Sequence, residues 1–449
     1  MKIKILYIAT AVLLTQSVNG LYAQKRALTL TDALEMAKQG NKAIQIQVLE
    51  EIHAKEMTRE TKGSLLPSIS ANAAYSRYFD RQVIFLPGSF AGTDKPVQDV
   101  AVGGKNTYNT FISLYQPVYA PVKHQLTKVS AINEKIENVK TADLKSRVAL
   151  KISTGYLDIL MMNRQLGSFE QSLERNIRAL KDSRSLLAQG RGLKSDTLSS
   201  FIAVENLRSS ISYLKNSIDV SGIELKRLIG LKEPVEIELT DPLELGIETS
   251  QSEFQQVDEA FGIAEKNRND ITIQKLMIHL TEKKLKATQA KLLPQISLIG
   301  QYQVQLQADD FKFSQYAWPK TSFVGIELSV PIFNGNRVQS QISQAKIKAQ
   351  QEDIRLHDLK DEVRTELATI ISKWKEALTQ LDIHETTIKS AELNHKMVES
   401  RFQNSLGSRL ELTDAELALT QAQINYLNAV YHLRILHVQL QHALGLLSL

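Results

Sequence analysis

The sequence predicts an α+β membrane protein in which two tandem repeats each join a β-hairpin to a long helical hairpin. Three observations predict this class. The two halves of the 449-residue chain resemble each other, two long blocks contain no proline, and four short stretches alternate between apolar and polar residues. Cysteine is absent, which excludes disulfide scaffolds, thiolate zinc sites and cysteine nucleophiles.

The first 23 residues have the pattern of a secretory signal peptide. Lys2 and Lys4 precede the apolar run 5–14, and the small residue Ala23 closes the segment. The apolar run is too short to cross about 30 Å of hydrocarbon as a helix. We therefore expect an exported chain. Its 54 basic and 49 acidic residues are spread along the chain, so no nucleic-acid partner is expected.

The two halves of the chain align at a nearly constant offset, which is typical of an internal duplication. The corresponding segments are 31–34 with 258–261, 65–70 (LLPSIS) with 292–297 (LLPQIS), 116–119 (QPVY) with 330–333 (VPIF), and 228–231 (LIGL) with 443–446 (ALGL). The first copy is longer between its proline landmarks, and the excess lies in 87–104. This difference predicts a longer loop in the first copy.

The duplication divides the chain into four parts. These are a signal peptide (1–23), a first repeat (24–231), an inter-repeat linker (232–258) and a second repeat (259–449). Each repeat is expected to hold a helix, then a β-hairpin, then a long helical hairpin. The two β-hairpins are expected at about 67–120 and 294–334.

Two blocks, 122–233 and 332–449, contain none of the ten prolines and are rich in good helix formers. Apolar residues recur in them at spacings of three and four, which is typical of coiled coils. Each block has one interruption, at 190–192 (GRG) and near 405–408 (SLGS). A continuous helix over 122–189 would be about 100 Å long, which is too long for a compact domain.

Residues 302–307 (YQVQLQ) and 323–330 (FVGIELSV) alternate between apolar and polar types, as a strand with two different faces does. The alternation is weaker in 69–75 and 108–114. Aromatic residues gather around these strands, as in outer-membrane barrels. We expect the apolar side chains to face lipid; those in the second repeat are Tyr302, Val304, Leu306, Val324, Ile326 and Leu328.

Four strands cannot close a barrel, because the smallest membrane barrels use about eight. An open strand edge in lipid leaves backbone groups without hydrogen bonds, at a cost of several kcal/mol each. A four-stranded chain in a bilayer must therefore oligomerise. Two copies would give eight strands and three copies would give twelve.

Several short segments, in this order and duplicated, resemble the TolC-like outer-membrane efflux channels. They are 30–34 (LTDAL), 66–67 and 293–294 (LP), 116–119 (QPVY), 330–335 (VPIFNG) and 440–446. The resemblance implies a homotrimer with a 12-stranded antiparallel β-barrel, four strands per chain, continued by a long periplasmic α-helical coiled-coil tunnel. It also implies a location in the outer membrane of a Gram-negative bacterium, with a large periplasmic part.

The same resemblance implies a function and partners. The chain would be the passive exit duct of a tripartite efflux or type I secretion system, surrounded by outer-membrane lipid. Its partners would be a periplasmic adaptor and an inner-membrane transporter that is proton-driven or ATP-driven. We expect no cofactor, no metal and no catalytic residue, since 103–106 (GGKN) is not a phosphate loop and 384–388 (HETTI) lacks the second histidine of a zinc protease motif.

The resemblance also implies positions for the periplasmic tip and gate. The tip residues, which would contact the adaptor, are Gly190, Gly192, Leu406 and Gly407. The gate would be lined by Glu411 and Asp414, which share a helix face, with Asp196 as the counterpart in the first copy. In a trimer each acid would form a ring that attracts cations. The alternative is that these acids are ordinary solvated side chains.

Two functions of other classes remain open at this point. One is a periplasmic coiled-coil structural or scaffold protein without a membrane barrel, in which the alternating strands face protein or water. The other is a secreted protein that binds sugars or peptides through the aromatic-rich segments 78–96 and 309–320.

Overall fold

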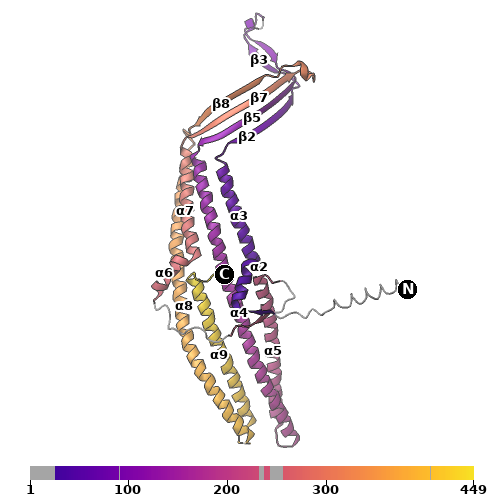
Figure 1. Cartoon of the computed structure of the whole chain (residues 1–449), viewed down its shortest axis with the longest axis vertical. Coiled ribbons are helices and arrows are strands. Elements are labelled where there is room, and N and C mark those ends of the chain that lie inside the picture. Colours follow the sequence, from indigo (N-terminus) through magenta and orange to yellow (C-terminus); the bar gives the residue numbers. More distant parts are fainter. Residues whose placement is uncertain (1–25, 91, 232–236, 243–255, 405) are drawn as a thin grey trace, which may run out of the picture. The chain divides into compact units, whose positions relative to one another are not determined.

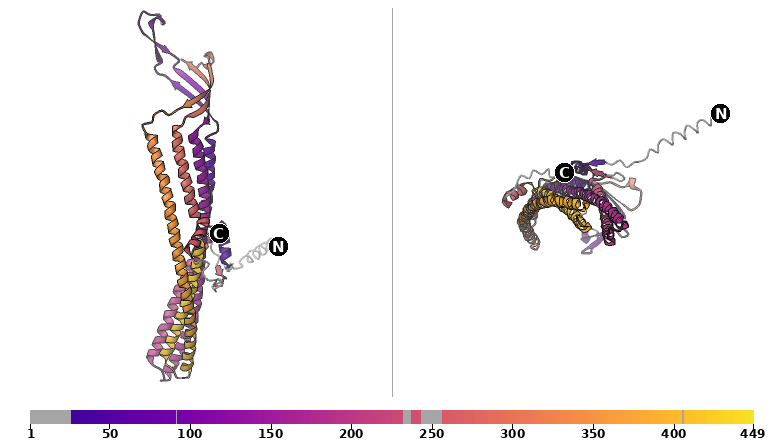
Figure 2. Two further views of the ribbon diagram at one scale, coloured as in Figure 1. Left: turned by 90° about the vertical axis from the view of Figure 1, so that its left-hand side faces the viewer. Right: turned by 90° about the horizontal axis from the view of Figure 1, so that it is seen from below.

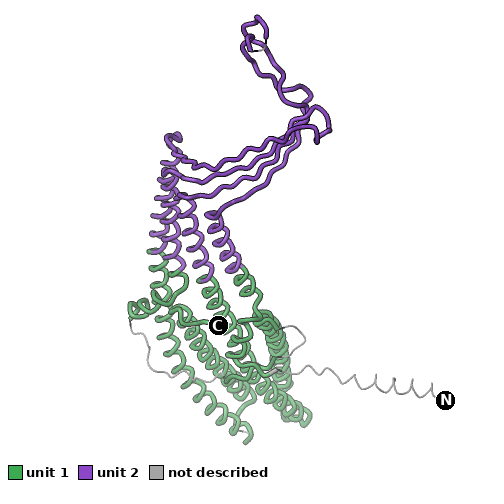
Figure 3. The backbone as a smooth tube through the Cα atoms, turned by 45° about the horizontal axis from the view of Figure 1, so that its top comes forward, with its two compact units in different colours: residues 1–49, 139–272, 357–449 green, residues 50–138, 273–356 purple. Residues whose placement is uncertain are grey.

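The computed structural model describes residues 26–90, 92–231, 237–242, 256–404 and 406–449. The predicted signal peptide, 1–23, and most of the predicted linker, 232–258, lie outside these described residues. The chain divides into two compact units. Unit 1 comprises 1–49, 139–272 and 357–449, and unit 2 comprises 50–138 and 273–356 (Figure 3).

The elements follow one another in an order that is nearly the same in the two halves of the chain (Figure 1). The first half contains β1 (Arg26–Leu28), α2 (Leu30–Gly40), α3 (Lys42–Gly63), β2 (Ser68–Arg77), β3 (Gln82–Leu86), η1 (Gly88–Phe90), β4 (Gln98–Val102), β5 (Asn106–Tyr119), α4 (Pro121–Ala188) and α5 (Lys194–Ile229). The second contains β6 (Ile237–Leu239), α6 (Val257–Asn267), α7 (Asn269–Gln289), η2 (Ala290–Leu292), β7 (Gln295–Ala308), η3 (Phe313–Gln315), β8 (Lys320–Ser329), α8 (Arg337–Gln403) and α9 (Arg409–Ala443).

Unit 2 contains one antiparallel sheet of four strands in the order β2-β5-β7-β8. Because β5 pairs with both β2 and β7, the strands of the two predicted hairpins form a single sheet. Ser68 lies opposite Tyr115, and Gln295 lies opposite Ser329. A bulge between Pro117 and Tyr119 interrupts the β5–β7 register.

The segment that the sequence predicts as a longer loop is a hairpin of its own. Among the residues that the structure describes, strands β3 and β4 pair only with each other, from Gln82 opposite Val102 to Leu86 opposite Gln98. Its base is held by Asp309, whose carboxylate pairs with Arg81 at 2.7 Å and accepts the Lys105 backbone N–H at 3.2 Å. The predicted excess region of the first copy, 87–104, therefore contains one of the two strands of this hairpin, β4.

Unit 1 has its main apolar core among α2, α4, α5, α8 and α9. Fully buried side chains in this core include Ile152, Tyr156, Leu225 and Leu433. The helix predicted over 122–189 is α4, with 68 residues, and α8 has 67. Seen from below, these helices lie in one curved layer (Figure 2).

A parallel strand pair that the sequence analysis did not predict closes the same core. Strand β1 pairs with β6, with Leu28 opposite Leu239. Tyr156 donates its hydroxyl to Leu28 O at 2.8 Å, and the Leu30 N–H donates to the Asp241 carboxylate at 2.8 Å. Thr29 and Asp32 cap the start of α2 reciprocally.

The helices α5 and α9 end in junctions of similar design. Gly230 follows α5 with φ +77°, and Gly445 follows α9 with φ +74°. This left-handed conformation favours glycine. A Cβ atom on Gly230 would lie 2.3 Å from Gly40 O, and one on Gly445 would lie 2.7 Å from the carbonyl carbon of Asn267. Each helix end therefore meets the backbone between two earlier helices.

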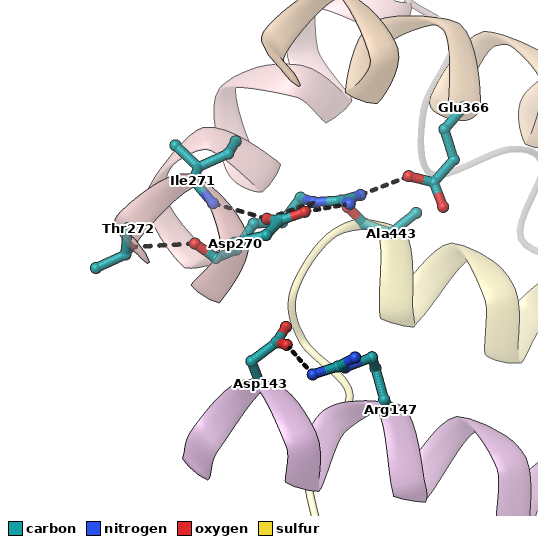
Figure 4. A network of polar contacts seen from close by, with 8 residues as sticks. Asp143, Arg147, Asp270, Ile271, Thr272, Glu366 and Ala443 are labelled. Carbon is teal, nitrogen blue, oxygen red and sulfur yellow. Dashed lines mark hydrogen bonds and ion pairs between the residues drawn. The ribbon is translucent and has the colours of Figure 1, made fainter. Parts of the chain in front are cut away.

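A side chain from that backbone reaches each helix end. Asn41 donates its amide to Leu228 O at 2.7 Å, and Arg268 Nη1 donates to Ala443 O at 3.1 Å. Arg268 also pairs with Asp270 at 2.7 Å and Glu366 at 2.6 Å (Figure 4). Burial acts to lower the pKa of Arg268, but the two carboxylates outweigh it and raise the pKa overall.

None of the helices in the described part of the chain combines the length and apolar character needed to cross a membrane.

Candidate functional site

The four-stranded sheet has one predominantly apolar and one predominantly polar face, and the strand register defines both. Residues paired across antiparallel strands point to the same side of a sheet. Val324 lies opposite Gly300, Ile326 opposite Leu298 and Leu328 opposite Ile296. Even-numbered residues of β7 and β8 therefore share a face, and the six predicted lipid-facing residues all lie on it.

The same register extends this face across β5 and β2. Ile112 lies opposite Tyr302, and Ala71 lies opposite Ile112. The apolar residues of this face are Ile69, Ala71, Ala73, Tyr75, Tyr108, Ile112, Leu114, Ile296, Leu298, Tyr302, Val304, Leu306, Ala308, Val324, Ile326 and Leu328. We call this set the apolar face.

On the apolar face, the side chains of the last strand, β8, are open to the surroundings. Val324 and Ile326 are each 76% exposed and Leu328 is 62% exposed. Val304 is half-buried. Leu306 is fully buried, so it offers no surface of its own to a surrounding phase.

The opposite face carries amides and hydroxyls that hydrogen-bond to one another. Ser70 and Ser113 hydroxyls lie 2.8 Å apart. Gln303 donates to Asn109 Oδ1 at 2.8 Å and accepts from Gln301 at 3.1 Å. We call this the polar face; its polar residues are Ser68, Ser70, Asn72, Ser76, Thr107, Asn109, Ser113, Gln295, Ser297, Gln301, Gln303, Gln305, Gln307, Thr321, Glu327 and Ser329.

The outer strands of this sheet, β2 and β8, each pair on one side only within the described residues. Their other sides carry backbone N–H and C=O groups that can accept another strand. A sheet with one apolar face and two open edges is suited to closure with further copies in an apolar phase.

The tip between α4 and α5 is shaped by its two glycines. Gly190 has φ +70° and donates its N–H to Leu187 O at 3.0 Å. Gly192 donates to Leu186 O at 3.1 Å, and a Cβ atom on it would crowd Leu186 and Leu187 at 3.1 and 3.0 Å. The predicted break therefore lies at a tight turn that reverses the chain.

The tip between α8 and α9 presents Leu406, which is 72% exposed. Its N–H donates to Arg401 O at 2.8 Å. Ser408 caps α9 by accepting the Glu411 N–H at 3.1 Å. Gly407 lies close to Glu411, because a Cβ atom on it would lie 3.3 Å from Glu411 Oε2. The Leu406 side chain is thus available to a partner.

The predicted gate acids occupy different environments in the single chain. Glu411 is exposed and pairs with Arg401 at 3.7 Å. Asp414 is also exposed, three residues along the same helix. Asp196 lies half-buried in the first turn of α5 and acts electrostatically on Arg409. The structure thus places Asp196 near the beginning of α9.

A buried charged cluster beside these acids was missed by the sequence analysis. Arg409 and Glu416 lie 4.0 Å apart, with side chains that are only 8% and 7% exposed. Burial is the main cause that raises the pKa of Glu416, and it also lowers the pKa of Arg409. Arg175 of α4 and Glu399 of α8 also act on Glu416. Helices α4, α5, α8 and α9 therefore each contribute an ionisable group that acts on this pair or belongs to it.

A signal for this cluster was present in the sequence. Arg409, Leu412, Glu416 and Leu419 follow one another at spacings of three and four, the positions of a coiled-coil seam. His395 of α8 is also buried, and burial lowers its pKa. No group of three or more His, Asp or Glu side chains within the described residues could hold a metal ion.

Comparisons with known proteins agree with this architecture. Residues 261–446 match the family model described as outer membrane efflux protein. The proteases secretion protein PrtF of Dickeya chrysanthemi is 19% identical over 445 residues, covering 92% of this chain and 90% of PrtF. The outer membrane efflux protein BepC of Brucella suis is 21% identical over 314 residues, covering 68% of this chain and 65% of BepC.

A solved structure supports the fold over nearly the whole chain. The outer membrane protein VceC of Vibrio cholerae has a TM-score of 0.73 and 15% sequence identity, covering 93% of this chain and 96% of VceC.

Proposed function

We propose, from this chain's membership of the TolC-like outer-membrane efflux channels, that it is the passive exit duct of a tripartite efflux or type I secretion system. The observation that carries the proposal is the two-faced sheet with open edges, whose strands continue into helices of 68 and 67 residues. A polar inner face and an apolar outer face are what a water-filled duct in lipid requires.

The duct is a homotrimer in the outer membrane. Four strands per chain cannot close, and the open edges of β2 and β8 support joining of one copy's β8 to the next copy's β2. Three copies give a 12-stranded antiparallel barrel, wide enough for a water-filled bore. The curved layer of unit 1 helices supports a helical tunnel in the periplasm (Figure 2).

The chain consists of two repeats, 24–231 and 259–449, joined by 232–258, after a signal peptide over 1–23. The two glycine junctions support this division. Asn41 and Arg268 stand at the sequence offset of 227 residues, and each donates to a carbonyl at the end of its repeat's last helix.

The duct has no catalytic role, and its mechanism is opening and closing of the periplasmic tip. The adaptor contacts the tips at Gly190, Gly192, Leu406 and Gly407, and an inner-membrane transporter, driven by protons or ATP, supplies the energy. Rings of Glu411 and Asp414, with Asp196 nearby, line the aperture and favour cations.

Lipid surrounds the apolar face of the sheet. Tyr302, Val304, Val324, Ile326 and Leu328 contact the acyl chains, and the exposure of the β8 residues supports this placement. Leu306 is excluded from direct lipid contact, because it is fully buried within the chain.

The test begins with the native mass of the unheated, detergent-extracted protein from the outer-membrane fraction. A mass of three chains, with the protein absent from the soluble fraction, is the expected result. A soluble monomer would overturn the proposal and favour a secreted binding protein; a soluble oligomer would favour a periplasmic scaffold.

A pair of substitutions tests which face meets lipid. Ile326→Arg places a charge on the apolar face and should cost about 2–4 kcal/mol near the bilayer midplane, which reduces the yield of membrane-embedded trimer. Gln301→Arg, on the polar face of the neighbouring strand, is the matched control and should assemble normally. Equal yields for the two variants would contradict the assignment of the faces.

A further inference from the structure

Four helix ends meet at one end of the four-stranded sheet. Helix α3 and η2 lead into β2 and β7, and β5 and β8 lead out to α4 and α8 (Figure 1). Side-chain contacts join neighbouring ends. Gln116 donates to Leu65 O at 3.0 Å, and Lys291 donates to Gln341 Oε1 at 2.9 Å. All these residues belong to unit 2.

The segments that join this end of the sheet to the helix ends carry positive charge only. The segments 61–67, 117–133, 283–294 and 330–351 contain no Asp and no Glu. We call their basic residues the basic collar; they are Lys62, Lys123, Lys128, Lys283, Lys284, Lys286, Lys291, Arg337, Lys346 and Lys348. The whole chain has 54 basic and 49 acidic residues, so such a segregation stands out from the average composition.

The opposite end of the sheet provides an internal comparison. Its two connections, 78–105 and 309–320, contain both signs of charge in equal number. The acids there are Asp80, Asp94, Asp99, Asp309 and Asp310, and the bases are Arg81, Lys95, Lys105, Lys312 and Lys320. The positive charge is thus a property of one end of the sheet only.

The charges of the basic collar are accessible and are not neutralised within the described chain. Eight of its ten side chains are exposed, and Lys123 and Lys283 are half-buried. None of the ion pairs between described residues involves a collar residue. Lys123 donates to Ser64 O at 3.1 Å and lies 5.3 Å from the centre of the Tyr115 ring. These contacts hold the ammonium group near the end of α3.

Helix stability does not account for all of these cations. Lys62 and Lys291 lie near helix C-termini, where the helix dipole favours positive charge. Lys123 and Arg337 lie in the first turns of α4 and α8, where the dipole disfavours it, and neither helix has an acidic residue in its first turn. The helix dipole therefore does not explain the positions of Lys123 and Arg337.

Exposed apolar side chains lie directly beside the collar. Ile332 is 95% exposed and Phe333 is 82% exposed, in the segment between β8 and α8. Leu66 is 64% exposed and Val118 is 63% exposed at the ends of β2 and β5. These residues place exposed apolar side chains between the sheet and the helix ends. The apolar side chains of the sheet are thus followed by a band of Lys and Arg. In a bilayer, the acyl chains are followed by charged headgroups in the same spatial order.

We infer that the basic collar binds the phosphate headgroups of anionic phospholipids in the membrane leaflet on the helical side of the sheet. This inference rests on the proposed membrane location of the sheet. Lys62, Lys123, Lys291 and Arg337, one at each helix end, lie nearest the apolar band and make the principal contacts. The remaining collar residues lie up to about 16 Å along the helices, and several are beyond the Debye length of about 8 Å at physiological salt.

The experiment measures insertion of the purified chain into vesicles of phosphatidylcholine, with and without roughly 30 mol% phosphatidylglycerol. The test variant is Lys62→Gln/Lys123→Gln/Lys291→Gln/Arg337→Gln. The control is Lys151→Gln/Lys181→Gln/Lys375→Gln/Lys396→Gln, which makes the same charge change at exposed positions of unit 1. Insertion is followed by flotation at about 50 mM and about 500 mM NaCl.

Phosphatidylglycerol should increase insertion of the wild-type chain and the control about tenfold at low salt, and high salt should remove most of the increase. The test variant should lose most of the increase and still insert into pure phosphatidylcholine. An equal loss in the control, or a wild-type chain indifferent to phosphatidylglycerol, would overturn the inference. Failure of the wild-type chain to enter any vesicle would instead count against the proposed membrane function.

Discussion

Arg409 and Glu416 form a buried ion pair, and the free-energy cost of removing both charges from water offsets their attraction. Their nearest charged atoms are 4.0 Å apart, and Arg409 Nε and Nη2 and Glu416 Oε2 have no hydrogen-bond partner among the described residues. The pKa of Glu416 is raised and that of Arg409 is lowered, mainly by burial in both cases. Each shift has the sign expected when removal from water outweighs the partner's charge.

We expect Glu416→Leu alone to destabilise the chain by about 3–5 kcal/mol, because it leaves Arg409 buried without its partner. The double variant Arg409→Met/Glu416→Leu should be neutral or more stable than the wild type. Thermal unfolding in detergent, followed by circular dichroism, compares the variants. Lys389→Met, which breaks an exposed pair with Glu385, is the control and should leave the midpoint unchanged. A double variant as unstable as the single one would contradict this account.

At the scale of single elements, glycines with similar backbone angles have different surroundings. Gly190 at the tip has φ +70° and Gly230 at the end of α5 has φ +77°. A Cβ atom on Gly190 would meet nothing within 4 Å, whereas one on Gly230 would meet three backbone atoms of Gly40 within 2.5 Å. The left-handed backbone conformation favours glycine at both positions, but only at Gly230 does the neighbouring backbone leave no room for a Cβ atom.

Gly190→Ala should therefore destabilise the chain only by the free energy needed to hold alanine in the left-handed conformation, about 1–2 kcal/mol. Gly230→Ala should cost more, because the Gly40 backbone must also move. Gly222→Ala, in the interior of α5 with nothing within 4 Å of the added Cβ, should stabilise the chain by about 0.5–1 kcal/mol. Thermal midpoints rank the three variants. A Gly190→Ala variant as unstable as Gly230→Ala would show that the tip is packed more tightly than the structure indicates.

Most elements could be predicted from local sequence. Helix α4 begins and ends within one residue of the predicted 122–189, because heptad spacing and the absence of proline act within the segment itself. The two-residue period predicted the faces of β7 and β8 in the same way. The hairpin of β3 and β4 was not predicted from the sequence. Its strands, 82–86 and 98–102, are short, show no clear alternation of apolar and polar residues, and are separated by a long connection.

At the scale of the whole molecule, the proposed trimer brings the acids of three tips together. Glu411 and Asp414 are exposed in the single chain, so their carboxylates remain accessible to water and ions. Threefold symmetry would concentrate their charge in a narrow bore, where it favours cations over anions.

Glu411→Gln/Asp414→Asn should lower the cation-to-anion permeability ratio of single channels in planar bilayers severalfold, with the trimer intact. Asp382→Asn/Glu392→Gln removes the same charge from exposed positions of α8 and should leave the ratio unchanged. Asp196→Asn should have a smaller effect, because Asp196 is half-buried and acts on Arg409. An unchanged ratio in the first variant would place the aperture elsewhere.

The sequence by itself determined the helices, their breaks, the alternation of the strands and the segment repeats, because each depends on residues close together in the chain. Only the tertiary structure decided the strand order, the pairing of β1 with β6, the contact of Arg268 with the end of α9, and the burial of Arg409 and Glu416. These features join residues from distant segments, and local propensity carries no information about which distant segments meet. The basic collar could be recognised only from sequence and structure together. The sequence contains its charges, and the sheet register brings the four helix ends together.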